Sequence, residues 1–386
     1  MTTVSRAILA TALLFGVTSV SVSARQAAQA AAGADTAPMA ETVFKNIRVL
    51  RGIPVDEFID TMGMFAAATA KDCTGCHSPE ILDGKPDAFA INTPMIDKAR
   101  FMVGMVNAIN RNYFGNQKRV SCATCHSNTS SPENVPNMGI QYGDPVENAD
   151  SMQFVIANGS NPAQIDGVFA KWIEALGGEQ RLTAATSYTA TGTYAGWDTG
   201  LSPIPVDIYA KAPGQLSLVA HRTEGDSVWT YDGRNAWRVT VNSAVPFTLP
   251  LTKGNLAEMQ LEATVALAPT RLRQAFAKWE ISKSLIDDKP VQILRGTNEG
   301  QTPVNFYFDN NGLLVRMLRW NDTAVGLVPT RYDFTDYRDI GGVKRPYGWV
   351  KTSTINQVTV ALKEIRPNVA IDAAKFAKPT TTRLIK

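Results

Sequence analysis

The residues with the clearest chemistry in this sequence are its cysteines and the histidines that follow them. They form two C-x-x-C-H motifs, at residues 73–77 and 122–126, which use all 4 cysteines and two of the 3 histidines. In such a motif both thiols bond covalently to a haem, and the adjacent histidine ligates its iron. The motifs therefore predict two covalently attached c-type haems. The thioether anchors would be Cys73, Cys76, Cys122 and Cys125, and the proximal iron ligands His77 and His126.

Two other uses of the cysteines remain open from the sequence. Two C-x-x-C pairs could bind structural zinc, and in an oxidising compartment they could form two disulfides. The gap from Cys76 to Cys122 is long for a zinc ribbon. Neither alternative gives a reason for a histidine directly after each pair, which favours haem.

Counting histidines restricts which residues could provide the sixth iron ligand. Only His221 remains outside the motifs, far along the chain, so bis-histidine ligation of both haems is impossible from this chain alone. A lone histidine there is typical of a surface or structural residue. Methionine is the alternative ligand, and it raises the reduction potential relative to histidine. The candidate methionines are Met62, Met64, Met95, Met102 and Met105.

A helix is expected before each motif. The first would begin at residues 53–57, with proline and acids in its first turn, and carry an apolar stripe of Val55, Phe58, Ile59, Met62, Phe65 and Ala66. The second would begin at Thr93 as N-cap and end near residues 112–115. Met64 lies about 200° round the first helix from Met62, whereas Met102 and Met105 share one face of the second.

The stretches before the two motifs resemble the photosynthetic reaction-centre cytochrome c subunit family. The resemblance rests on residues 43–55 (VFKNIRVLRGIPV) and 99–110 (ARFMVGMVNAIN), and covers residues 41–130. It implies a di-haem cytochrome in which each methionine comes from the helix preceding its own motif. Carried over by position, it assigns Met62 to the haem on His77 and Met102 to the haem on His126, with Met64 and Met105 as alternates.

Three features depart from that family. Its photosynthetic members carry four haems, usually have Arg-Gly after the motif histidine, and lack a large C-terminal half. This chain has two motifs, Ser127-Asn128 after the second, and a long C-terminal half. The layout is similar to two-haem relatives of non-phototrophic bacteria.

The N-terminus predicts export. Arg6 precedes an apolar run at residues 7–22, and Val22-Ser23-Ala24 suits cleavage, so residues 1–24 read as a signal peptide. The remaining organisation is a flexible leader at 25–40, an all-α di-haem domain at 41–130, a linker at 131–160 and a β domain at 161–386. A periplasmic location fits covalent haem attachment. The formal charge of +3, without a long basic run, gives no reason to expect nucleic-acid binding.

The C-terminal half predicts an α+β domain. A helix at 162–176 would end at Gly177-Gly178, and a second at 256–279 would break at Pro269. Alternating apolar residues predict strands at 186–197, 216–220, 227–232, 237–241, 291–297, 304–308, 313–320, 328–338 and 346–362. Asp309-Asn310-Asn311-Gly312 is a hairpin-turn signal. Many antiparallel strands with a helical insertion indicate a curved sheet or open barrel.

This half resembles the lipoprotein-carrier (LolA/RseB-like) fold of periplasmic carriers and sensors. The resemblance rests on the helix–Gly-Gly–strand opening, residues 231–233 (YDG) and residues 339–342 (DIGG). It implies a concave sheet under a helical lid, with a pocket for an acyl chain or another hydrophobic ligand. The alternative is a packed domain that docks the cytochrome to a partner.

The sequence as a whole predicts an exported electron carrier rather than an enzyme. Its partners would be redox proteins or a membrane electron-transfer complex. The alternatives are a di-haem peroxidase, which needs an open distal site, and a redox or hydrophobic-ligand sensor that uses the β domain as its binding module.

Overall fold

A computed structural model describes residues 35–136, Met138 and residues 159–380, except Gly84, Asn242, Ser243 and Pro246. The predicted signal peptide and most of the predicted linker lie outside these residues. The end of the predicted leader is packed rather than free, because Ala37 and Ala40 are buried. From Thr36 onward the chain forms one compact unit.

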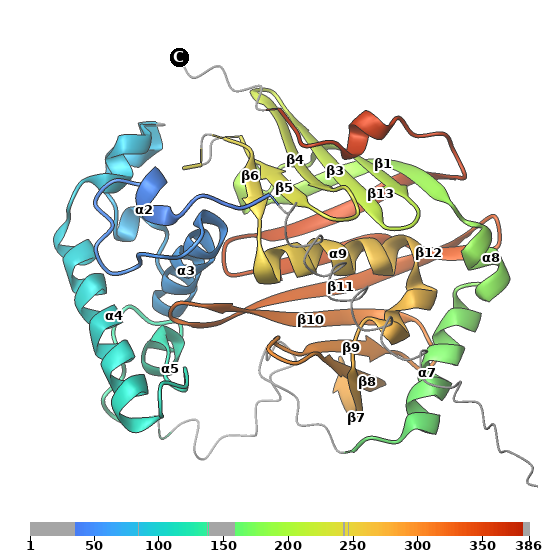
Figure 1. Ribbon diagram of the computed structural model, residues 1–386, viewed down its shortest axis with the longest axis horizontal. Coiled ribbons are helices and arrows are strands. Elements are labelled where there is room, and N and C mark those ends of the chain that lie inside the picture. Colours follow the sequence, from blue (N-terminus) through green and yellow to red (C-terminus); the bar gives the residue numbers. More distant parts are fainter. Residues whose placement is uncertain are drawn as a thin grey trace, which may run out of the picture. The chain divides into compact units, whose positions relative to one another are not determined.

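The N-terminal part is helical, as Figure 1 shows. Its main helices are α2 (Ala40–Val43), α3 (Val55–Thr69), α4 (Pro94–Tyr113) and α5 (Cys122–His126), and its short 3-10 helices are η1 (Cys73–Gly75), η2 (Pro79–Asp83) and η3 (Pro86–Ala90). The predicted start of α4 is confirmed, because the Thr93 hydroxyl accepts a hydrogen bond from the Ile96 amide. Helix α3 ends at Ala70, which adopts a left-handed conformation.

The face that α3 buries differs from the predicted apolar stripe. The fully buried residues of α3 are Val55, Asp56, Asp60, Thr61, Gly63, Met64 and Ala68. Phe58, Ile59, Met62 and Phe65 are only partly buried. The reason is tertiary: a polar side of the helix is packed against the C-terminal sheet through hydrogen bonds, a partner that periodicity along the helix cannot reveal.

A 13-stranded antiparallel sheet dominates the C-terminal part. Its strands are β1 (Ser187–Gly196), β2 (Ile204–Lys211), β3 (Gln215–Arg222), β4 (Gly225–Tyr231), β5 (Ala236–Val239), β6 (Leu249–Leu251), β7 (Lys278–Ile286), β8 (Lys289–Thr297), β9 (Val304–Phe308), β10 (Leu314–Thr323), β11 (Gly326–Ile340), β12 (Val343–Ser353) and β13 (Gln357–Pro367). Their order is β6-β5-β4-β3-β2-β1-β13-β12-β11-β10-β9-β8-β7. Every strand therefore pairs with its neighbours in sequence, except that β6 and β7 form the two edges and β1 pairs with β13. The predicted curved sheet is confirmed.

Three details of the strand prediction were wrong. Residues 346–362 form two strands, β12 and β13, joined by a turn in which Ser353 and Asn356 exchange hydrogen bonds. The break predicted at Pro269 is confirmed, because α9 ends at Leu267 and a 3-10 helix begins at Pro269, but the last residues of the predicted helix begin β7. Strands β2, β6 and β7 were missed. Short or proline-containing strands such as β6 carry too little alternation to be recognised locally.

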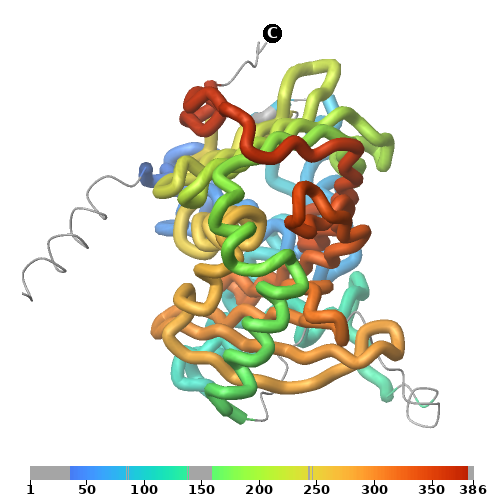
Figure 2. The backbone as a smooth tube through the Cα atoms, turned by 90° about the vertical axis from the view of Figure 1, so that its right-hand side faces the viewer, coloured from blue at the N-terminus to red at the C-terminus, as the bar shows by residue number. Residues whose placement is uncertain are grey.

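Helices cover the sheet and connect its edges. Helix α7 (Pro162–Ala175) ends at Gly177 and Gly178, both with positive φ as predicted, and α8 (Glu179–Ala184) follows. Helix α9 (Lys253–Leu267), the 3-10 helix η5 (Pro269–Gln274) and the chain beyond lead from edge strand β6 to edge strand β7. The sheet bends around α9, as Figure 2 shows from the side. The short helix η6 (Ala373–Phe376) follows β13.

The sheet and its helices enclose most of the apolar core. One cluster lies between α9 and strands β1–β4, and a second between α7 and strands β7–β11. In the described part of the chain, no helix is both long and apolar enough to cross a membrane.

Candidate functional site

The first motif lies on η1, where Asp72 orders its turn. The Asp72 carboxylate accepts hydrogen bonds from the Gly75 amide at 3.1 Å and from the Thr74 hydroxyl at 2.6 Å. The Cys76 carbonyl accepts a hydrogen bond from the Thr93 hydroxyl, which also caps α4. One threonine therefore links the first motif to the helix that precedes the second.

The second motif forms α5. Ser121 and Thr124 make a capping box at its start, and Ser127 ends it with a left-handed conformation. The Asn128 amide then donates to the Ala68 carbonyl at 3.0 Å. The second motif thus packs on α3, the helix that precedes the first motif.

Both motif histidines are oriented in the same way. In His77, Nδ1 lies 3.0 Å from the Phe89 carbonyl, and in His126, Nδ1 lies 3.1 Å from the Thr129 carbonyl. A carbonyl partner holds the proton on Nδ1 and leaves Nε2 as the unprotonated nitrogen. Partial burial lowers the pKa of His77, which favours the neutral, ligating form. Each ring therefore suits an iron at Nε2.

The four motif cysteines are free thiols in this structure, so the disulfide alternative is not what the fold contains. Cys73 and Cys125 are exposed, while burial raises the pKa of the partly buried Cys76 and Cys122. Within the described ranges, no three His, Cys, Asp or Glu side chains come close enough to hold a metal ion. A haem needs no such cluster, because its porphyrin supplies four ligands, so the motif residues fit it.

The candidate methionines occupy different environments. Met64 is 4% exposed and packs with Leu50, Val103, Val325 and Val328, whereas Met62 lies partly buried at the margin of that cluster. On α4, Met102 is partly buried and Met105 is 38% exposed. Met95 is partly buried in the first turn of α4. The assignment of distal ligands stays a prediction.

The structure adds a contact surface that sequence reasoning missed, between α3 and the sheet domain. The Asp56 carboxylate accepts hydrogen bonds from the Thr252 amide at 2.6 Å and the Thr252 hydroxyl. The Asp60 carboxylate accepts from Asn255 and Asn321, at 2.9 and 3.1 Å. Burial raises the pKa of Asp60 to about 6 despite these bonds. Two early acids on a helix look like solvent-facing residues, so no local signal identified them.

Gly63 and Met64 continue this contact surface along α3. A Cβ on Gly63 would lie 2.6 Å from both the Thr354 hydroxyl and Ile355 Cγ1, in the β12–β13 turn. One residue on, the Met64 methyl lies near Gly326, at the β10–β11 turn. Two hairpin turns of the sheet therefore pack closely against α3, the helix that bears Met62.

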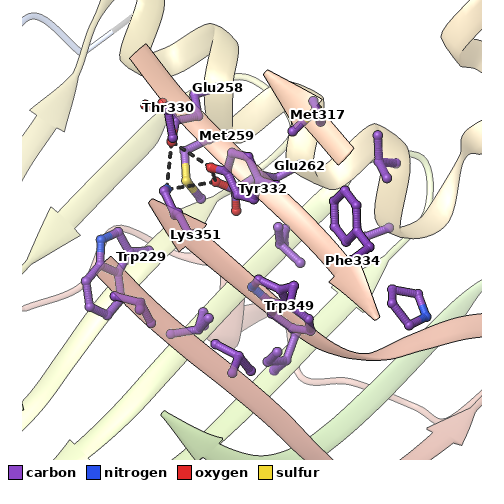
Figure 3. A pocket seen from close by; sticks show the side chains of 18 of the residues that line it. Trp229, Glu258, Met259, Glu262, Met317, Thr330, Tyr332, Phe334, Trp349 and Lys351 are labelled. Carbon is purple, nitrogen blue, oxygen red and sulfur yellow. Dashed lines mark hydrogen bonds and ion pairs between the residues drawn. The ribbon is translucent and has the colours of Figure 1, made fainter. Parts of the chain in front are cut away.

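The sheet domain also contains a cavity of about 430 Å³ between α9 and the concave face of the sheet. Ile59 and Asp60 belong to its lining, so the cavity reaches α3, the helix that precedes the first motif. Figure 3 shows its charged cluster and, farther along the strands, Phe334 and Trp349. Lys351 lies 2.6 Å from Glu258 and 3.1 Å from Glu262, and the Tyr332 hydroxyl donates to Glu258 at 2.7 Å.

Electrostatics in this cluster favour ionised pairs. Burial alone would raise the pKa of Glu258, but Lys351 and Arg319 outweigh it and lower that pKa. Burial would lower the pKa of Lys351, but Glu258 and Glu262 outweigh burial and raise that pKa. His221, in contrast, pairs with Asp207 and Asp226 on strands β2–β4, in agreement with the structural role expected for it.

Comparison with known proteins supports the identity of the motif region. Residues 16–165 match the family described as photosynthetic reaction centre cytochrome C subunit. This match supports a cytochrome and implies c-type haem as its cofactor. No curated protein matches the chain at a significant level.

Solved structures resemble the sheet domain. A DUF1329 family protein from Desulfovibrio piger matches with 10% identity and a TM-score of 0.39, over 56% of this chain and 98% of its own. A LolA superfamily protein from Nitrosomonas europaea matches with 12% identity and a TM-score of 0.36, over 55% of this chain and 97% of its own. A lipoprotein-sorting protein domain from Vibrio parahaemolyticus matches with 13% identity and a TM-score of 0.29, over 54% of this chain and 97% of its own.

Proposed function

We propose that this chain is an exported di-haem c-type cytochrome that carries single electrons. The observation that carries the proposal is the pair of C-x-x-C-H motifs in which each histidine is held by a backbone carbonyl at Nδ1. Bound haem would supply a reversible one-electron Fe(III)/Fe(II) couple. The family match over residues 16–165 supports electron transport as the general role.

In this proposal the chain's own residues anchor, orient and shield the haems. Cys73 and Cys76 would hold one haem, and Cys122 and Cys125 the other. The Phe89 and Thr129 carbonyls fix the ring orientation of the proximal histidines. Met62 on α3 and Met102 on α4 would complete the ligand sets, while partly buried apolar residues of α3 exclude water.

The partners of such a carrier would be redox proteins or a membrane electron-transfer complex, outside the cytoplasm. Covalent haem attachment in bacteria takes place there, which agrees with the signal peptide predicted for residues 1–24. The chain would not act as an enzyme, because a methionine on each iron leaves no open position for peroxide.

The test is a haemochrome stoichiometry together with visible and near-infrared spectra, on protein matured with a haem-attachment system. The proposal expects two haems per chain and the weak near-infrared band of methionine-to-ferric-iron ligation. Met62→Ala and Met102→Ala should each remove about half of that band. Covalent haem with a high-spin signal would favour the peroxidase alternative, and chains without covalent haem would overturn the proposal.

A second candidate role, ligand binding by the sheet domain, is favoured by one observation. The cavity beneath α9 is within the range of about 300–1,000 Å³ that small-molecule sites occupy, at about 430 Å³. Because Ile59 and Asp60 of α3 line it, a bound ligand would contact the helix that bears Met62. A ligand sensor with a haem reporter is therefore the alternative that this geometry supports.

A further inference from the structure

The cavity beneath α9 is elongated, because one strand and one helix run along it. Strand β12 contributes Val343, Arg345, Trp349, Lys351 and Ser353, alternate residues of one face. At about 3.3 Å per residue, Arg345 and Lys351 lie roughly 20 Å apart along the strand. Helix α9 runs antiparallel to β12 along the same axis, since Glu258 and Glu262 meet Lys351 while Ala266 meets Arg345.

The two ends of the cavity differ in how their charges are balanced. At the Lys351 end, Lys351 pairs with Glu258 and Glu262, and the buried Arg319 also pairs with Glu258. Two cations thus meet two carboxylates. In this set each cation has a carboxylate partner, and the one further cation that lines this side of the cavity, Arg238, acts on the nearby carboxylate of Asp60.

Arg345, at the other end, has no carboxylate partner among the described residues. It is 7% exposed. Its guanidinium donates one hydrogen bond to the Ala266 carbonyl and lies 4.5 Å above the Tyr188 ring. A guanidinium carries five N–H donors, so most of its capacity is unused. Burial lowers the pKa of Arg345, which reports the cost of holding this charge without a counter-ion.

The region between the two ends is largely apolar. Trp229, Phe334 and Trp349 line it, with aliphatic side chains of β2, β3 and β13. A ligand with its anionic group at Arg345 would therefore place the rest of its length against apolar surface.

We propose that this cavity binds an elongated amphipathic anion, whose carboxylate or phosphate pairs with Arg345 and whose apolar body lies between α9 and the sheet. The proposal rests on the second candidate function, ligand binding by the sheet domain. It adds the charge of the ligand and its direction in the cavity. A bidentate guanidinium–anion pair would supply the counter-ion that the described residues lack.

The test is equilibrium dialysis of the full-length, haem-loaded protein against four labelled probes: dodecanoate, dodecyl phosphate, dodecanol and acetate. The anionic chains should bind about tenfold or more tightly than dodecanol, because a charge-assisted pair contributes about that factor. Acetate should show no measurable binding, because it lacks the apolar body. The ratio of dodecanoate to dodecyl phosphate affinity distinguishes the two kinds of head group.

Variants then place the anion. Arg345→Gln should weaken dodecanoate binding by about tenfold or more and leave dodecanol within about twofold. Arg345→Lys should keep part of the preference, because it keeps the charge but not the planar fork. The matched control is Arg338→Gln: Arg338 is the cross-strand neighbour of Arg345, is 53% exposed and pairs with Asp336 outside the cavity lining. This control should bind dodecanoate normally.

The possible outcomes distinguish failure of the anion site from failure of ligand binding by the sheet domain as a whole. Equal affinity of the wild-type chain for dodecanol and dodecanoate would overturn the anion site but keep a ligand-binding cavity. Absence of binding for every chain probe would overturn both. Because the wild-type comparison needs no variant, a folding defect in Arg345→Gln, seen by thermal unfolding, would not leave the proposal undecided. The electron-transfer proposal is tested independently by the spectra above.

Discussion

At the scale of single residues, two methionines on α3 that are close in sequence have different surroundings. Met64 is nearly inaccessible and packs between α4 and the β10–β11 turn. Met62 is partly buried at the edge of the same cluster. A side chain already enclosed by apolar neighbours contributes mainly to packing, whereas a partly buried one remains accessible to a bound group.

The two methionines should therefore separate ligation from stability. Met64→Ala should lower the free energy of unfolding by about 2–5 kcal/mol, the range for truncating a buried methionine, and keep the near-infrared band. Met62→Ala should reduce the band and cost less stability. Urea denaturation and near-infrared absorption on both variants check this. Loss of the band in Met64→Ala alone would exchange the two roles.

His221 provides a pH-dependent stability. Burial is the largest single effect on its pKa and lowers it, but the hydrogen bonds and charges of Asp226 and Asp207 together outweigh burial and raise the pKa. A raised folded-state pKa stabilises the fold below the unfolded value of about 6.5, and this contribution is lost as the pH rises through the folded value. His221 and its two aspartates are partly exposed, so solvent screening should limit the effect to at most about 1 kcal/mol.

The measurement is urea denaturation of wild type and His221→Gln at about pH 5.5 and about pH 9, either side of the histidine pKa. Wild type should be the more stable protein at the lower pH, and the difference should shrink at the higher pH. Asp322→Asn is a control, because Asp322 pairs with Lys118 away from this histidine. An identical difference at both pH values would contradict the ion-pair account.

At the scale of elements, α3 is fitted to two turns of the sheet. A Cβ on Gly63 would lie 2.6 Å from two atoms of the β12–β13 turn. Such a contact forces helix and turn apart, and overpacking of this kind costs about 1–3 kcal/mol. Gly63→Ala should therefore destabilise the protein, although alanine is the better helix former.

Gly167 in α7 is the matched control for this prediction. It lies in a helix interior, is exposed, and a Cβ there meets nothing within 4 Å. Gly167→Ala should stabilise by about 0.5–1 kcal/mol through backbone entropy. Thermal unfolding of both variants decides the point, and stabilisation by both would show that the α3–turn contact is loose.

At the scale of the whole molecule, the helical part and the sheet domain share one compact unit. Asp56 and Asp60 are buried carboxylates that connect α3 to α9 and β10. Because both parts lose buried hydrogen bonds if they separate, they should unfold together.

Asp56→Ala tests this coupling, because it leaves the Thr252 amide without its acceptor. The expected loss is about 1 kcal/mol or more of unfolding free energy, because the Thr252 amide is partly buried and would lose its acceptor. Haem absorbance and tryptophan fluorescence should report coincident transitions in wild type, and both should shift in the variant. Separate transitions in wild type would show that the two parts unfold independently.

The sequence predicted much of the local structure, for local reasons. Thr93 before Pro94 marks a helix start through its own capping bond, and Gly177-Gly178 marks a helix end through positive φ. Residues 309–312 formed the expected turn, in which the Asp309 carboxylate accepts from the Leu313 amide. Haem chemistry was predicted from the motif residues, their fixed spacing and the small number of histidines. The family match over residues 16–165 supports that prediction.

Only the tertiary structure decided how these parts meet. Asp56 and Asp60 are acids near the start of a helix, where side chains usually face solvent, yet both are buried because their partners lie about 200 positions later in the chain. The unpaired Arg345 and the ion pairs around Glu258 likewise depend on which side chains a curved sheet brings under α9. Haem-attachment motifs and helix caps involve residues close together in the chain, so the sequence alone determines them. Buried charges and the shape of the cavity depend on segments far apart in the chain, so only the tertiary structure determines them.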